Sequence, residues 1–409
     1  MPLIQQRSLY NKFLKTTTLD VFFYFVIYMY LSFFSPYLDT LGWSEGMKGI
    51  FFSVFSMTGI FMATIAGTLS DKIGRFKLII IGMCLEVVAL VGYAYVQNTV
   101  ALLFLRVLSA IAFNLVVVSA MARINDVVNN KNRSVANGLF HSIISVAAMT
   151  APLIGGFVAD FYGFKILFLI AMSSMLALIG GFLIFDYFFF NPKKHFYRDH
   201  KGLLKARDFN PFKNIKDFLS YPRLRSIAVL GFMANLTVPL TGLVFPFIII
   251  QRMGLSNSHL SIVIFTTGLA YIMQYFLGHL TNRMGKGRGI IIGLSISSLG
   301  IFTLFFVNTF EVFLLVVFIK SLGSALWNIS AWSYMSDIGE DNKMEGKVVG
   351  SYVSLARIAI TISFVASGFL LDFFSTHILI VYAIAMVLPL FFVGKIFLKK
   401  TKQELSWEH

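Results

Sequence analysis

Long apolar stretches alternate with short polar segments along most of the chain. A helix that crosses a bilayer needs about 20 consecutive apolar residues, so each stretch is long enough for one crossing. The pattern predicts an all-α polytopic membrane protein with twelve transmembrane helices. The predicted spans are residues 17–38, 48–69, 78–97, 100–121, 136–160, 164–186, 226–250, 259–281, 289–307, 311–333, 348–371 and 377–397.

Composition excludes an ordinary soluble domain. The 409 residues are 57% hydrophobic and 13% charged, whereas soluble domains have roughly 45–50% and about 25%. Cys84 is the single cysteine, so a disulfide framework and a cysteine-based metal site are both excluded. The first apolar stretch is too long for a signal-peptide core, and we expect it to be retained as the first span.

The basic residues gather on one side of the predicted spans. Of the 34 Lys and Arg residues, 28 lie in the terminal segments, the central linker and the loops after the even-numbered spans. This distribution predicts that both termini are cytoplasmic. It also explains the net charge of +15 by orientation and by attraction to anionic lipid headgroups, so no nucleic-acid partner is expected.

Three pairs of similar stretches recur about 212 residues apart, at matching positions in the span order. Such internal symmetry is typical of transporters built from two related halves. We therefore predict an amino-terminal six-helix bundle over 1–190, a basic linker over 191–224 and a carboxy-terminal six-helix bundle over 225–409. The pairs are Gly67–Arg75 with Gly278–Lys286; Arg106 and Asn114 with Lys320 and Asn328; and Gly138, Ser142, Gly156 and Asp160 with Gly350, Ser354, Gly368 and Asp372.

The loop after the second span resembles a motif of the major facilitator superfamily (MFS), G-x-L-x-D-[RK]-x-G-R-[RK]. The matching residues are Gly67, Leu69, Asp71, Lys72, Gly74 and Arg75, and Phe76 departs from the pattern. In the fourth span, Arg106 resembles the membrane-embedded arginine of the same family. The resemblance implies an MFS fold of two pseudo-symmetric six-helix bundles, a monomer, and a loop that latches the halves in one state of transport.

The fifth span contains a stretch close to the G-P-x-x-G-G element of drug/proton antiporters in this superfamily. Pro152, Gly155 and Gly156 match it, and Ala151 replaces its first glycine. Ala147, Ala151, Gly155 and Ala159 also recur every four residues and form one small-residue stripe. Plain helix packing explains this spacing, and gating at a moving interface is the alternative.

Five charged residues fall inside the predicted spans, where a charge costs several kcal/mol unless it is paired or hydrated. For Glu86 the alternatives are a structural hydrogen-bonded carboxyl and a proton-coupling carboxylate, because burial favours the neutral form and a nearby cation favours the charged form. Asp20 competes for the coupling role, or it favours the start of the first helix electrostatically. The five residues are Asp20, Glu86, Arg106, Lys320 and Arg357.

The cations outnumber the carboxylates at this depth, so a substrate with a carboxylate, phosphate or sulfate is one hypothesis. The resemblance places the fourth and tenth spans along the central cavity and the eleventh beside it. Polar and aromatic neighbours would supply hydrogen bonds and stacking, although core packing also explains the aromatic residues. The predicted substrate site is Tyr24, Arg106, Asn114, Asn235, Lys320, Trp327, Asn328 and Arg357.

These features predict a secondary active transporter of the plasma membrane that moves a small organic solute by alternating access. Proton-coupled efflux by antiport is preferred, and the alternatives are uptake of an organic anion, by proton coupling or uniport, and a membrane sensor that binds without transport. A nucleotide-driven pump is excluded because there is no G-x-x-x-x-G-K-[ST] loop. An enzyme is disfavoured because the seven His residues are scattered, and neither a cofactor nor a metal is expected.

Overall fold

The computed structural model describes residues 3–127, 133–189, 219, 222–341, 345–388 and 390–391. Helices and short connections make up these residues, with no strand among them. The prediction of an all-α protein is therefore confirmed. Most of the predicted linker, 191–224, and the end of the last predicted span lie outside the described residues.

Five of the six described amino-terminal helices have 21 residues or more, as the apolar stretches predict, and one has 7. They are α1 (Leu3–Leu31), α2 (Phe34–Thr40), α3 (Glu45–Ile73), α4 (Arg75–Tyr95), α5 (Thr99–Val127) and α6 (Arg133–Phe189). Pro36 lies in the first turn of α2, where the missing N–H group of proline has no helical partner to lose. The chain therefore breaks between α1 and α2 without leaving an unsatisfied donor at Pro36.

The carboxy-terminal helices are less regular and include short segments as well as two long helices of 32 and 30 residues. They are α8 (Pro222–Asn235), the π-helices η3 (Leu240–Val244) and η4 (Phe247–Arg252), α9 (Asn257–Ile272), α10 (Gln274–Met284), α11 (Lys286–Leu304), α12 (Phe310–Asp341), α13 (Glu345–Phe374) and the 3-10 turn η5 (Ser375–His377). Pro239 and Pro246 immediately precede η3 and η4. Because proline disrupts regular α-helical hydrogen bonding, wide turns at these positions are expected.

Eight helical segments of the described residues are long and apolar enough to cross a membrane, or up to ten if each of two bent pairs is one span. One of the eight, Leu139–Ile184, is 46 residues long and contains a break at Gly163, where φ is 80°. At about 1.5 Å per residue this segment has the length for two crossings. The protein is a multi-pass membrane protein, and the count of twelve stays a prediction.

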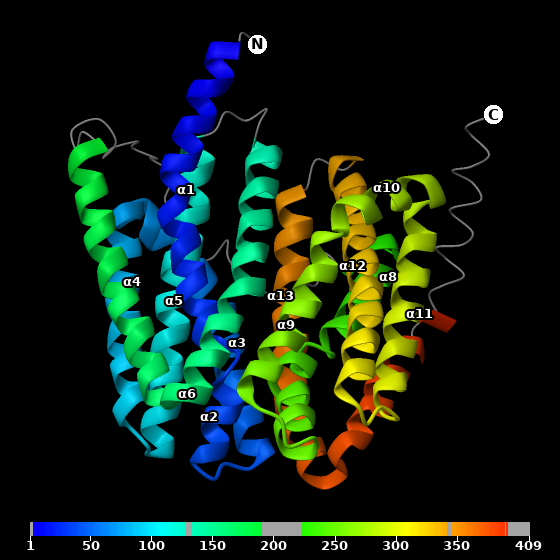
Figure 1. The fold of residues 1–409 in the computed structure, drawn as a ribbon. Helices are drawn as coiled ribbons and strands as arrows, with labels where there is room; N and C mark the ends of the chain where they lie inside the picture. Colours follow the sequence, from blue (N-terminus) through cyan, green and yellow to red (C-terminus); the bar gives the residue numbers. More distant parts are fainter. Residues whose placement is uncertain are drawn as a thin grey trace, which may run out of the picture. The chain divides into compact units, whose positions relative to one another are not determined.

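The chain divides into two compact units. The first unit comprises 1–41 and 54–208, and the second comprises 42–53 and 209–409, so α3 begins in the second unit and continues in the first. Figure 1 shows α4 beside α5 in the first unit and α11 beside α12 in the second. In the second pair the backbones come close, because a Cβ atom at Gly293 would lie 2.9 Å from the Cα atom of Trp327.

The predicted sequence repeat has a counterpart in the backbone. Gly74 (φ 98°) and Gly285 (φ 89°) are aligned by the repeat, and each lies immediately before the helix that follows it, α4 or α11. Both glycines adopt a positive φ that side-chain-bearing residues rarely tolerate. The same tight turn therefore occurs at both copies of the motif.

Candidate functional site

A fully buried carboxylate, Glu86, lies where α1, α4 and α5 meet inside the first unit. Its side chain has no exposed surface. The Tyr30 hydroxyl donates to Glu86 Oε1 at 2.5 Å, and the Ser109 hydroxyl donates to the same oxygen at 2.8 Å. Hydroxyl donors from two other helices therefore solvate a carboxylate that has no contact with water.

Arg106 provides the buried positive charge of the same region. It is 2% exposed, and its guanidinium carbon lies 4.6 Å from the ring centre of Phe34 and 4.4 Å from that of Phe55. Cation–π contacts of this kind stabilise a cation away from water. Arg106 precedes Ser109 by three residues on α5, so both share the helix face that meets Glu86, with which Arg106 interacts electrostatically.

Asp20 forms a buried ion pair in the first unit. Its carboxylate is fully buried and lies 2.6 Å from Nη2 of Arg123, whose side chain is 12% exposed. The guanidinium of Arg123 also lies 5.2 Å from the ring centre of Phe182. The predicted span 100–121 ends before Arg123, whereas α5 continues to Val127 and includes this arginine.

Two predicted substrate residues of the first unit make contacts within the helix bundle. The Tyr24 ring packs against Phe113 and Phe140 with ring centres 6.3 and 6.0 Å away. The Asn114 side-chain amide donates to the carbonyl of Ala110 one turn earlier, at 2.8 Å. Tyr24 also interacts electrostatically with Asp20, and the substrate role of Tyr24 and Asn114 stays a prediction.

The predicted substrate residues of the second unit lie on three helices. Lys320 on α12 is 8% exposed, and within the described part of the chain no hydrogen bond or ion pair of its ammonium group is found. On the same helix Trp327 is buried and Asn328 is partly buried. Asn235 on α8 donates to the carbonyl of Gly231 at 2.7 Å, and Arg357 on α13 is partly buried.

The motif after α3 forms a charged turn at the helix ends. Arg75 lies 2.6 Å from Asp126 on α5 and 3.6 Å from Asp71 on α3, and the Asp71 side chain is 51% exposed. Lys72 is exposed, and the Gly67 backbone lies beside Val118. Arg75 therefore links α4 to α5, a connection that the motif alone did not predict.

The small-residue stripe of α6 lies against α1. Pro152 is buried within α6 and Gly156 is buried close by. A Cβ atom at Gly155 would lie 2.9 Å from the backbone carbonyl carbon of Met29 on α1, so the two backbones approach closely at this point. This geometry agrees with the packing interpretation of the stripe, and gating stays a prediction.

Sequence analysis missed the partners of the buried charges. Tyr30 is one of 16 tyrosines in a chain that also has 45 phenylalanines, so nothing in the sequence marked it as the partner of a buried charge. Ser109 carried a usable signal, since it follows Arg106 by three residues on the same helix face. No group of three His, Cys, Asp or Glu residues suited to a metal ion was found in the described residues.

The sequence profile of the Major Facilitator Superfamily matches the chain twice, over residues 18–272 and 227–408. The chain belongs to the Major Facilitator Superfamily. An uncharacterized MFS-type transporter of Methanocaldococcus jannaschii is 26% identical over 82% of this chain and 85% of its own length. Multidrug resistance protein 2 of Bacillus subtilis is 23% identical over 77% of this chain and 78% of its own length.

The crystal structure of the nucleoside transporter NupG has the same fold. It is 13% identical, with a TM-score of 0.74 over 95% of this chain and 98% of NupG. The protein is therefore a membrane transporter of small molecules, related to drug-resistance transporters, and not an enzyme.

Proposed function

We propose that this MFS transporter exports small organic solutes by exchanging them for protons, with Glu86 as the coupling carboxylate. The observation that carries the proposal is the complete burial of Glu86 among hydroxyl donors, close to the Arg106 guanidinium. A carboxyl group in such a site is sensitive to small changes in its surroundings, because burial favours the neutral form and the donors and cation favour the charged form.

A proton-coupled cycle follows from this balance. If solute binding draws the cation and the hydroxyl donors toward Glu86, the charged form is stabilised and the proton is released. If the solute leaves, these contacts weaken and the carboxylate takes up a proton, so solute and proton occupy the protein in turn. Two helices besides its own contribute these contacts, so small helix shifts within the first unit would suffice to change the protonation state.

Asp20 is the competing coupling residue. Its pairing with Arg123 at 2.6 Å favours the charged form strongly, and a buried pair of this kind is costly to break. We therefore assign Asp20 a structural role and Glu86 the coupling role. The relationship to Multidrug resistance protein 2 supports export of drug-like solutes over uptake.

The wider transport cycle is part of the proposal. The two halves predicted over 1–190 and 225–409 would alternate access to a site between them, in a plasma-membrane monomer with both termini cytoplasmic. The distribution of basic residues supports this orientation. The motif at Asp71 and Arg75 would latch one state, and Pro152, Gly155 and Gly156 would lie at a helix contact that moves.

Reconstituted vesicles with an acidic lumen test the proposal directly. Purified protein should accumulate ethidium in the lumen while the pH gradient lasts, and a protonophore should abolish accumulation. Glu86→Gln should lose gradient-driven accumulation. The matched control Glu311→Gln alters an exposed carboxylate in the first turn of α12 and should retain it. Gradient-driven accumulation by Glu86→Gln at the wild-type rate would contradict the proposal.

Uptake of an organic anion is the second candidate, and the buried ammonium of Lys320 favours it. The same vesicles loaded with carboxyfluorescein distinguish the two. Flux of this anion that ignores the pH gradient and is lost in Lys320→Gln would support a uniporter. Binding of either dye without any flux would support a sensor.

A further inference from the structure

A group of aromatic rings lies in the first unit between Glu86 and the carboxy-terminal end of α4, and the proposed function does not use it. The rings belong to Phe34, Tyr37, Tyr93 and Phe168, which we call the aromatic block. The Phe34 ring centre lies 4.8 Å from that of Tyr93 and 5.7 Å from that of Phe168. Each of the four residues is at most 7% exposed. Rings from α2, α4 and α6 therefore pack together on this side of the carboxylate.

Tyrosine hydroxyls lie on both sides of the aromatic block. On one side, the Tyr30 hydroxyl donates to Glu86 Oε1 at 2.5 Å. On the other side, the Tyr37 hydroxyl donates to the carbonyl of Tyr93 at 2.9 Å and lies 3.3 Å from that of Val96, the residue that follows α4. A hydroxyl both donates and accepts, so each can accept a proton from one neighbour and pass another proton on.

The Phe168 ring contacts all three tyrosines of this region. Its centre lies 6.1 Å from the ring centre of Tyr30, 5.0 Å from that of Tyr37 and 5.6 Å from that of Tyr93. The side chain is fully buried and has no polar atom. Phe168 is therefore an apolar step between the tyrosine that reaches the carboxylate and the tyrosine at the end of α4.

Tyr93 extends the polar surroundings of Glu86 toward Phe168. It is 1% exposed and interacts electrostatically with Arg106 and Glu86. Ser109 also interacts with Tyr93, and its hydroxyl lies 2.8 and 3.1 Å from the two carboxylate oxygens of Glu86. The aromatic block thus meets the Glu86 cluster through polar side chains, and its apolar part is short.

Removal of the Phe168 ring would change the chemistry of this step. Water enters a cavity inside a protein when the cavity is wide enough and offers two to four polar partners. A cavity at residue 168 would be bordered by three rings that carry hydroxyls, those of Tyr30, Tyr37 and Tyr93. Water in place of the Phe168 ring would join these hydroxyls into one hydrogen-bonded chain that ends at Glu86.

We propose that Phe168 is an insulating residue, which stops protons from passing between Glu86 and the carboxy-terminal end of α4. The proposal rests on the proton exchange proposed for Glu86. A proton has no hydrogen-bond partner beside an apolar ring, so it does not cross there. If water replaced the ring, each proton that Glu86 accepted from the Tyr30 hydroxyl would be replaced on that hydroxyl by one from the water chain. Protons would then flow without solute and would dissipate the gradient that drives export.

Proton flux without any solute tests this role. The purified full chain is reconstituted in vesicles that contain a pH-sensitive dye, with potassium and valinomycin to balance charge. Phe168→Ala should dissipate an imposed pH gradient about tenfold faster than the wild type, which corresponds to a barrier lower by about 1.4 kcal/mol. Glu86→Gln added to Phe168→Ala should restore the wild-type rate, because the chain then lacks its proton-accepting carboxylate. A leak that persists in this double variant would overturn the proposal.

One control separates insulation from the general effect of a buried cavity. Phe313 of the second unit is also fully buried, and its ring centre lies 5.6 Å from that of Phe245. Phe313→Ala opens a cavity of the same size beside another phenylalanine, so it should keep the wild-type proton flux. An equal leak in Phe313→Ala and Phe168→Ala would overturn the proposal.

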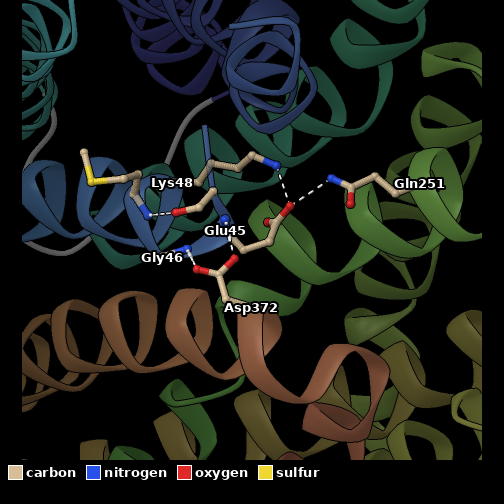
Figure 2. Close-up of polar contacts among 7 residues, drawn as sticks. Glu45, Gly46, Lys48, Gln251 and Asp372 are labelled. Atoms are coloured by element: carbon tan, nitrogen blue, oxygen red, sulfur yellow. Dashed lines mark hydrogen bonds and ion pairs between the residues drawn. The ribbon is translucent and has the colours of Figure 1, made fainter. Parts of the chain in front are cut away.

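A second control uses another buried carboxylate. Figure 2 shows Glu45 in the first turn of α3, where its Oε1 lies 2.5 Å from the Lys48 ammonium and its backbone N–H donates to Asp372 at 2.9 Å. Glu45 is 6% exposed. Glu45→Gln added to Phe168→Ala should leave the leak in place, in contrast to Glu86→Gln. Loss of the leak in both double variants would contradict a route that ends at Glu86.

A milder variant keeps the test decisive if Phe168→Ala does not fold. Phe168→Tyr keeps the ring and adds one hydroxyl to the apolar step, so it should leak at a rate between those of the wild type and Phe168→Ala. Wild-type flux in Phe168→Tyr would overturn the insulating role and leave the exchange proposed for Glu86 intact. Conversely, ethidium accumulation that survives Glu86→Gln would overturn the exchange, whereas the leak measurement would still report on Phe168.

Discussion

The two halves of this transporter share a sequence repeat but differ in their buried charges. In the first unit, Arg106 lies between two aromatic rings near Glu86, and Asp20 is paired with Arg123. In the second unit the equivalent of Arg106 is Lys320, for which the described residues provide no ion pair, and the alignment of Gly74 with Gly285 makes Ser297 of α11 the equivalent of Glu86.

The difference indicates that the two copies have different roles. The hydroxyls of Ser297 and Ser324 share a neutral hydrogen bond at 2.9 Å, and the neighbouring Ser298 donates to the carbonyl of Ala383 at 2.9 Å. Neither contact exchanges a proton at ordinary pH. At these equivalent positions the first unit thus has a titratable carboxyl group and the second has a serine, whereas the buried charges of the second unit include Lys320 and the Glu45–Lys48 ion pair. The two copies of the repeat share a helical pattern, and they differ in which charged side chains are buried.

The largest expected effect compares Arg106 with Lys320. Arg106→Met leaves Glu86 buried without its cation, so it should destabilise the protein by about 3 kcal/mol or more. Lys320→Met removes a buried ammonium and should be neutral or stabilising. Denaturant titration of both purified variants in mild detergent measures the change in the free energy of unfolding. Equal destabilisation by the two substitutions would contradict the claim that the two buried cations have different environments.

An intermediate effect compares Ser109 with Ser298. Ser109→Ala removes a donor to a carboxylate and should cost about 1.5–3 kcal/mol, whereas Ser298→Ala removes a donor to a carbonyl and should cost about 1 kcal/mol. The same titration checks the order of the two values. A larger loss in Ser298→Ala would indicate that Glu86 gains little from its hydroxyl donors.

The smallest expected effect compares the two copies of the loop motif. Asp71 is half exposed and lies 3.6 Å from Arg75, so Asp71→Asn should change the free energy of unfolding by less than about 0.5 kcal/mol. We expect ethidium accumulation to fall in this variant, because the proposed role of Asp71 is in the cycle and not in folding. The reverse change in the second copy, Asn282→Asp, should leave accumulation unaltered.

Much of the fold was predictable because a bilayer imposes a simple rule on the sequence. Apolar stretches of about 20 residues identified the helices, and the rarity of charges within them identified Glu86 and Asp20. Helix ends were less predictable, since α5 extends past its apolar stretch and brings Arg123 to Asp20. A polar helix end contains no periodic signal that distinguishes it from a loop.

Contacts between distant segments were not predictable. Tyr30 and Glu86 are separated by 56 residues, and Glu45 and Asp372 by 327. A single sequence specifies which residues are polar, but their pairing depends on how the helices pack in three dimensions. The sequence therefore identified the candidate residues as separate positions, and only the structure identified their partners.

The aromatic rings around Arg106 have an electrical consequence. A guanidinium keeps its proton in proteins, so Arg106 has a constant positive charge. The nearby carboxyl group of Glu86 would gain and lose a proton in each cycle. The net charge of the cluster would then change by one unit within each cycle. Moving one unit of charge across a membrane corresponds to about 2.3 kcal/mol per 100 mV. The membrane voltage would therefore drive exchange of a proton for a neutral solute, whereas exchange for a monovalent cation such as ethidium would move no net charge and would depend on acidity alone.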